Sequence, residues 1–340
     1  MLGSRQDVPT AAVWLLLAGT CVFSQERTWT DTSPHRVQFV RVEGDVELEV
    51  LDWGGSGRPL VLLAGSGNSA HVYDDFAPRL TASCHVYGIT RRGYGASSHA
   101  GSGYSAERLG DDVLAVLDSL HLAAPVLAGH SLGGHELTAL ASAHPSRVAG
   151  LVYMDSTADP AFDWKPYEEL RKNLPSAYPP MTYPQATPED RRSFQRYREW
   201  QRRVLGIAFP ESDLRAVFAA SPDGSVGPYM SARGVGNAIH DGMHSPDYSR
   251  IRVPVLAFFS LPKALEVQLR LYPPNNEKER NAIEQVYAAD MSYVKGSIAR
   301  LRTGVPDARV VELVGANHYI FLANEPEVLR EIRAFLATLH

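Results

Sequence analysis

The chain of 340 residues is 44% hydrophobic and 21% charged, which is ordinary for a globular protein and long enough to enclose a large core. Its formal net charge of −5 gives no reason to expect a polyanionic partner such as a nucleic acid. The sequence carries no zinc-type cysteine clusters, phosphate-cradling glycine loops or internal repeats, so we expect neither a metal ion nor a cofactor.

The first segment has the pattern of an export signal. Arg5 precedes an apolar run at residues 11–23, which is too short to span a membrane comfortably. The small residues before Gln25 suit cleavage by signal peptidase. Asp7 weakens the positive charge expected at the start of a signal peptide, so an uncleaved anchor is the alternative. We expect a signal peptide at residues 1–24, an exported (periplasmic or secreted) protein, and no stable membrane span after cleavage.

Short strands follow along the chain. Alternating residues at 37–42 and 46–53 predict an antiparallel hairpin. Short apolar runs predict further strands at residues 59–63, 85–89, 125–128, 149–154, 253–259 and 309–314. Helical patterns such as residues 106–120 separate these runs, which indicates βαβ units and a mostly parallel sheet. Ligands of such sheets bind at the carboxyl ends of the strands.

The most informative motif follows the strand at residues 125–128. The chain there reads Gly129-His-Ser131-Leu-Gly133, and residues 134–144 then have a helix-forming composition. A strand, a sharp turn and a helix form the context of a nucleophile elbow, where only small neighbours fit. The turn would lift the Ser131 hydroxyl above the sheet at the start of a helix, where partial positive charge favours a developing oxyanion.

Residues 157–247 differ in character from the strand-rich segments on either side, and we interpret them as a lid. A helix in this insertion carries apolar residues at helical spacing, namely Phe194, Tyr197, Trp200 and Val204. Such a stripe usually forms a local core, and in a lid it can also cover a pocket. The insertion is therefore where we expect substrate choice to be set. A second, charged helical insertion, at about residues 273–306, could pack beside it.

Two histidines of the insertion have a spacing that metal ligands can use. His240 and His244 stand four residues apart, but Gly242 interrupts the helix that this geometry needs, and no third ligand is evident nearby. We expect them to be polar lid residues.

A histidine stands in the loop between the last strand and the last helix. Residues 309–314 alternate as a strand, and residues 325–339 form an amphipathic closing helix. Between them lies His318, where a mobile general base is expected. Its place after Ser131 and near the C-terminus agrees with the chain order Ser, acid, His.

These motifs resemble the α/β-hydrolase family over roughly residues 36–156 and 248–340. The resemblance implies an α/β fold with a mostly parallel eight-stranded sheet, flanking helices and a helical cap. It also implies that residues 25–156 and 248–340 form the two parts of the hydrolase core, and that residues 157–247 form the cap.

The resemblance implies an oxyanion hole as well. In the family, the loop after the strand at residues 59–63 usually reads His-Gly-x, whereas this chain has Ala64-Gly65-Ser66. The glycine turn is kept and the histidine is missing. By position, the two oxyanion donors would be the backbone N–H groups of Ser66 and Leu132.

Two residues are candidates for the catalytic acid. Many family members carry it after the strand that corresponds to residues 253–259, but no aspartate stands there and the nearby acid is Glu266. Asp155 directly follows the strand at residues 149–154, a position that haloalkane dehalogenase-like members use. We therefore expect Asp155 to be the acid, with Glu266 as the alternative.

The resemblance implies a serine hydrolase that cleaves carboxylic esters of small molecules through an acyl-enzyme on Ser131, assisted by His318 and Asp155. One alternative is a hydrolase of amides, of the proline-iminopeptidase kind, or of C–C bonds with the same triad. Another is a noncatalytic protein that uses the lidded pocket to bind a ligand. The sequence leaves the oligomeric state open.

Overall fold

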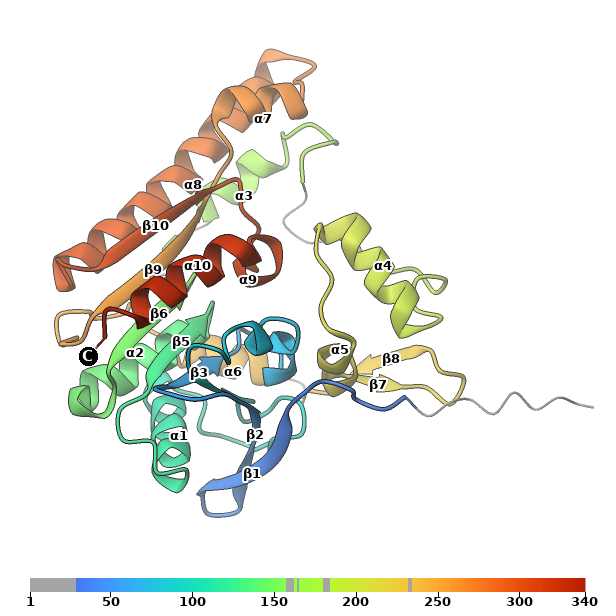
Figure 1. Ribbon diagram of the computed structural model, residues 1–340. Helices are drawn as coiled ribbons and strands as arrows, with labels where there is room; N and C mark the ends of the chain where they lie inside the picture. Colours follow the sequence, from blue (N-terminus) through green and yellow to red (C-terminus); the bar gives the residue numbers. More distant parts are fainter. Residues whose placement is uncertain (1–28, 157–161, 164, 180–183, 232–233, 340) are drawn as a thin grey trace, which may run out of the picture. The chain divides into compact units, whose positions relative to one another are not determined.

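An eight-stranded sheet organises this protein, whose computed structural model describes residues 29–339 except 157–161, 164, 180–183 and 232–233. Its strands, in spatial order, are β1 (Arg36–Glu43), β2 (Val46–Gly54), β4 (His85–Ile89), β3 (Pro59–Leu63), β5 (Val126–His130), β6 (Gly150–Met154), β9 (Val255–Leu261) and β10 (Arg309–Val314). β1 pairs with β2, and β2 with β4, in antiparallel fashion, and the remaining neighbours are parallel. The expected hairpin and mostly parallel sheet are confirmed (Figure 1).

The strands and helices all belong to one compact unit, Ser33–His340. The other unit, Met1–Thr32, is described only from residue 29, so the expected signal peptide at residues 1–24 lies outside the described residues. Among the described helices, none is both long enough and apolar enough to cross a membrane.

Helices cover both faces of the sheet. α1 (Ala106–Ser119), α2 (Gly133–Ala143) and the last part of α8 (Glu277–Gly304) contribute to the hydrophobic cluster on one face. The short helices η1 (Ala70–Tyr73) and η2 (Ala77–Arg79), with α9 (Ile320–Ala323) and α10 (Glu325–Leu336), contribute to the cluster on the other. Side chains at α1 positions such as Val113, Val116 and Leu117 are buried because they recur at helical spacing.

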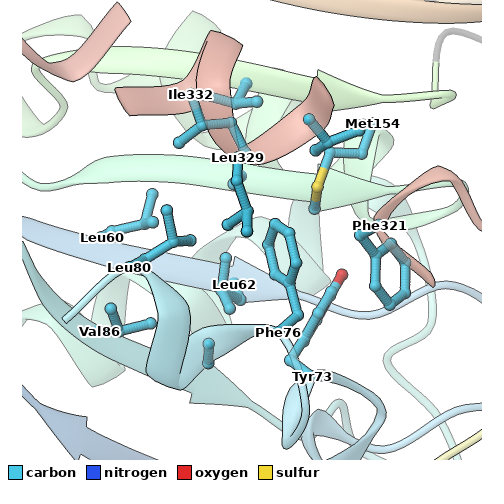
Figure 2. Packing of buried hydrophobic residues seen from close by; sticks show 14 of the residues in the cluster. Leu60, Leu62, Tyr73, Phe76, Leu80, Val86, Met154, Phe321, Leu329 and Ile332 are labelled. Atoms are coloured by element: carbon cyan, nitrogen blue, oxygen red, sulfur yellow. The ribbon is translucent and has the colours of Figure 1, made fainter. Parts of the chain in front are cut away.

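Neighbouring residues of each central strand point to opposite faces, so both faces are apolar. In β3, Leu60 and Leu62 join the cluster beneath η1 and α10, and Val61 and Leu63 join the cluster beneath α1 and α2. Figure 2 shows Leu60 and Leu62 among the aromatic and aliphatic side chains of the first cluster. A sheet buried on both faces leaves only the strand ends available for chemistry.

The insertion between β6 and β9 contains short helices and a small hairpin. Its elements are α3 (Lys165–Arg171), α4 (Phe194–Leu205), α5 (Glu211–Val217), β7 (Phe218–Ala220), β8 (Val226–Tyr229) and α6 (Val235–Asp241). The apolar stripe of α4 forms a local core, in which Phe194, Tyr197 and Trp200 pack with Leu214 of α5 and Val226 of β8. The antiparallel pair β7–β8 was not expected from the sequence.

The second insertion is helical, as expected. It contains the whole of α8, and α7 (Leu265–Leu271) directly precedes it. The Arg171 guanidinium of α3 lies 3.2 Å from an Asp290 carboxylate oxygen of α8, so the second insertion does pack beside the first.

A buried carboxylate connects α5 to the core. Asp74, which follows η1, accepts hydrogen bonds from His35 Nδ1 (2.9 Å), His71 Nδ1 (3.0 Å), Trp53 Nε1 (3.1 Å) and the Ser212 hydroxyl of α5. Burial alone would raise the pKa of Asp74, but the hydrogen bonds from the two histidines and the charge on His71 hold the pKa well below its usual range.

His71 is the cationic partner in this cluster. Its other ring nitrogen, Nε2, lies 3.4 Å from Glu49 Oε1. Burial alone would lower the pKa of His71, but the hydrogen bonds to Asp74 and Glu49 and the two negative charges raise it to about 10. A pKa raised in the folded state stabilises the fold fully below the unfolded value of 6.5, and this contribution is lost as the pH rises through about 10.

We predict that His71→Gln lowers the free energy of unfolding at pH 7 by about 3 kcal/mol, because it leaves Asp74 and Glu49 without their buried cation. Urea unfolding of both proteins between pH 7 and pH 10.5 should show this difference shrinking as wild-type His71 loses its proton. His99→Gln, at an exposed position, is the control and should change little. A deficit for His71→Gln that stays constant across this pH range would contradict a role for the charge.

Candidate active site

The turn between β5 and α2 holds Ser131 in a strained conformation. Ser131 has a φ of +50°, in the left-handed region that side chains other than glycine rarely occupy. Its N–H donates to the Met154 carbonyl at the end of β6 (3.3 Å), which fixes the turn against the neighbouring strand. The strand, sharp turn and helix expected around Ser131 are all present.

The glycines around Ser131 are required by close approach of backbone. A Cβ at Gly129 would lie 2.6 Å from the Gly133 backbone, and one at Gly133 would lie 2.6 Å from the Leu63 carbonyl oxygen. A Cβ at Gly65 would lie 2.8 Å from His130 Nδ1 and 3.1 Å from Ser131 Cβ. The loop after β3 therefore lies directly against the Ser131 turn.

His318 and Asp155 are in contact. His318 Nδ1 lies 2.7 Å from Asp155 Oδ2, and the Ser260 N–H donates to Asp155 Oδ1 (2.8 Å). Asp155 follows β6 with a φ of +52°, a conformation that aspartate tolerates better than most residues. With Nδ1–H donating to the carboxylate, His318 Nε2 is left as a proton acceptor. Glu266, the alternative acid, is exposed in the first turn of α7.

His130 contacts the loop that carries His318. It is fully buried next to Ser131, its Nε2–H donates to the His318 carbonyl (3.1 Å), and its ring centroid lies 4.6 Å from that of His318. Burial, assisted by the nearby His318, holds the pKa of His130 well below its usual value, so the ring stays neutral. Sequence reasoning missed this role, although His130 lies inside the Gly-x-Ser-x-Gly motif.

The two expected oxyanion donors border the same turn. Ser66 is exposed in the loop after β3, and Leu132 caps the N-terminus of α2. Within the described part of the chain, the N–H of neither residue has a hydrogen-bond acceptor. Both amides are therefore available to a ligand oxygen.

A cavity of about 210 Å³ opens beside Ser66 and Gly67. Its wall includes six aromatic side chains, Tyr197, Trp200, Phe209, Phe218 and Tyr229 from the insertion and Tyr319 from the loop after β10. The Tyr229 hydroxyl donates to the Gly67 carbonyl (3.0 Å), and the Tyr319 hydroxyl to Asn68 Oδ1 (3.1 Å). The α4 stripe thus serves both as a local core and as a cavity wall.

Asp213 of α5 fixes the chain just after the Ser66 loop. Its carboxylate accepts from the Ser69 N–H (2.9 Å), the Ser69 hydroxyl (2.8 Å) and Asn68 Nδ2 (2.7 Å). Burial raises the pKa of Asp213 to about 6, against the opposing effect of these hydrogen bonds. No local sequence pattern indicated this contact, because its partners lie far apart along the chain.

Other residues singled out in the sequence lie away from this site. His240 lies in the last turn of α6, and His244 Nε2 lies 3.3 Å from Glu107 Oε1. Both histidines are exposed. His35, His71 and Asp74 are residue types that bind metals, but the Asp74 oxygens already accept the hydrogen bonds described above, so we assign no metal there.

Known proteins share this architecture. A solved structure of E-2-(acetamidomethylene)succinate hydrolase matches with a TM-score of 0.64 and 19% identity, covering 89% of this chain and 100% of that one. A marine microorganism esterase matches with a TM-score of 0.57 and 21% identity, covering 86% and 100%. At these identities the likeness shows the fold alone.

Sequence relatives match over shorter segments. The 2-hydroxymuconate semialdehyde hydrolase of Pseudomonas sp. (strain CF600) is 35% identical over 106 residues, which are 30% of this chain and 38% of that protein. The chain covers between 30% and 48% of the length of the first curated relatives it matches. The model of the Alpha/beta hydrolase family, however, matches residues 60–332. This match spans most of the chain, and the protein belongs to the alpha/beta hydrolase family.

Proposed function

We propose that the protein is a serine hydrolase that cleaves carboxylic esters of small molecules, with Ser131 as nucleophile, His318 as general base and Asp155 as the acid. The observation that carries the proposal is the 2.7 Å contact between His318 Nδ1 and Asp155 Oδ2, at the strand ends where the strained Ser131 turn also lies. A neutral serine hydroxyl is a weak nucleophile near pH 7, and an adjacent oriented base is what activates it.

The reaction uses each group in turn. Ser131 Oγ attacks the ester carbonyl while His318 Nε2 takes its proton, and Asp155 stabilises the imidazolium that forms. The N–H groups of Ser66 and Leu132 bind the tetrahedral oxyanion, and each such donor lowers the barrier by about 3 kcal/mol. The imidazolium protonates the leaving alcohol, and His318 then activates the water that cleaves the acyl-enzyme.

The aromatic cavity beside Ser66 supports an ester with a compact apolar or aromatic group. An aminopeptidase-like alternative would need free carboxylates in the insertion to grip a substrate amine. Four carboxylates of the insertion come into question. Three of them form ion pairs, Glu169 with Lys172, Glu189 with Arg192 and Arg196, and Asp190 with Arg203, and Glu168 is exposed on the surface of α3. Hydrolysis of another amide or of a C–C bond is the second candidate, since named relatives of this chain include hydrolases of both kinds of substrate.

We predict that Ser131→Ala folds normally and loses almost all hydrolysis of p-nitrophenyl esters, because no other group can form the acyl-enzyme. In the wild type, a fluorophosphonate should label Ser131 and no other residue, as read by peptide mass spectrometry. Ser249→Ala, in an exposed loop, is the control and should be labelled like the wild type. Labelling that survives in Ser131→Ala would refute the assignment, and turnover of aminoacyl-arylamides in preference to esters would favour the amide alternative.

We predict that Asp155→Asn lowers kcat by roughly 10³–10⁴-fold, because the amide can favour the wrong tautomer of His318. KM should change far less, since Asp155 lies behind the imidazole. Glu266→Gln is the matched change at the alternative acid and should leave kcat nearly unchanged. Steady-state kinetics of the two variants decide between the positions, and a large loss in Glu266→Gln with a mild effect in Asp155→Asn would reverse the assignment.

A further inference from the structure

A buried arginine contacts the loop that carries Ser66. Arg91 follows β4 and is only 4% exposed. Its Nη2 donates to the Ala64 carbonyl (2.6 Å) and its Nη1 to the Gly65 carbonyl (3.3 Å), while Nε donates to Glu136 of α2. Each of the three guanidinium nitrogens thus donates a hydrogen bond. Because burying a charged group is costly unless it is paired and hydrogen-bonded, a buried arginine at this place requires an explanation.

The contact with Gly65 constrains the neighbouring amide. The Gly65 carbonyl and the Ser66 N–H belong to one planar peptide unit, and in a trans peptide they point in opposite directions. A guanidinium that holds the carbonyl therefore directs the N–H to the opposite side of the loop. A cation on the carbonyl oxygen also polarises the amide and makes its N–H a stronger donor.

Glu136 connects the same arginine to the other half of the site. Glu136 is 3% exposed and lies in the first turn of α2, the helix that begins just after Leu132. Burial raises the pKa of Glu136, and the charge and hydrogen bond of Arg91 oppose that rise. The Arg91–Glu136 pair thus joins the loop that carries one proposed oxyanion donor to the helix that carries the other.

We propose that Arg91, held by Glu136, is a positioning residue that sets the Ser66 amide for oxyanion binding. This inference rests on the proposed serine hydrolase mechanism. The loop after β3 keeps the glycine of the family pattern but has Ala64 in place of the histidine. Here the carbonyls of Ala64 and Gly65 are held by Arg91, which follows the adjacent strand β4.

The neighbouring arginine provides a matched control. Arg92 is 2% exposed and forms an equally buried pair with Asp112, at 2.6 Å and 2.7 Å. Its other acceptors are Glu43 and the Ser102 carbonyl, so none of its bonds reaches the Ser66 loop. Substituting Arg92 removes a buried arginine pair of the same kind without disturbing the proposed oxyanion donors.

The test compares Arg91→Lys with Arg92→Lys. Lysine keeps the charge but lacks the planar fork that reaches two carbonyls and a carboxylate together. Deleting one oxyanion donor typically lowers kcat roughly 10²–10³-fold, and displacing a donor should lower kcat less than that. We therefore expect kcat of Arg91→Lys to fall roughly 10–100-fold, with KM within about twofold of the wild type. The Ki of a trifluoromethyl ketone, which mimics the tetrahedral intermediate, should rise by the same factor as kcat/KM falls. Arg92→Lys should keep all three values within about twofold.

If Arg91→Lys does not fold, the double variant Arg91→Met/Glu136→Leu removes both charges, retains apolar packing, and should show the same loss in kcat. The inference is overturned if kcat is unchanged in the folded Arg91 variants, or if Arg92→Lys loses as much. Failure of the underlying mechanism is distinguishable, because the wild type itself would then escape fluorophosphonate labelling at Ser131.

Discussion

The close packing of three strand ends is the constraint on which the site depends. The loop after β3, the Ser131 turn after β5 and the Asp155 turn after β6 lie so near one another that a single Cβ at Gly65, Gly133 or Gly134 would collide with a neighbour. Two of these turns carry non-glycine residues with positive φ, at Ser131 and Asp155. Strain of about 1–3 kcal/mol at each persists only where the surroundings hold it, and here the parallel sheet and its two buried faces do so.

Around this constraint, polar side chains of neighbouring elements hold the loops in place. His130 supports the backbone of His318, Arg91 holds the carbonyls before Ser66, and Asp213 holds the residues after it. Asp213 and Ser212 are neighbours on α5, so a single turn of the insertion contacts both the Ser66 loop and the Asp74 cluster. The insertion is thus more than a cover, because it takes part in fixing the loop that the proposed mechanism needs.

The parts of this arrangement that could be predicted are those with local signatures. The alternating hairpin, the apolar runs of the central strands and the Gly-x-Ser-x-Gly turn each follow from short-range physics, and the structure contains all of them. For the acid, the resemblance to haloalkane dehalogenase-like members favours Asp155 over Glu266, and it is Asp155 that contacts His318. The sequence does not indicate the β7–β8 hairpin or the hydrogen bonds of Arg91 and Asp213. The strands of the hairpin are only three and four residues long, too short for a clear alternation. The partners of Arg91 and Asp213 are distant in sequence, and Arg91 and Glu136 carry no pattern that distinguishes them from surface charges.

In the proposed mechanism, the N–H groups of Ser66 and Leu132 and the ring of His318 converge on one tetrahedral centre at Ser131. A crystal structure of the protein with an aryl boronic acid tests it most directly. The account predicts a covalent bond from boron to Ser131 Oγ, and one boronate oxygen about 2.7–3.1 Å from both amide nitrogens. A second oxygen should lie within hydrogen-bond distance of His318 Nε2. A boronate bound elsewhere, or bonded to Ser131 with its oxygens turned away from Ser66 and Leu132, would contradict it.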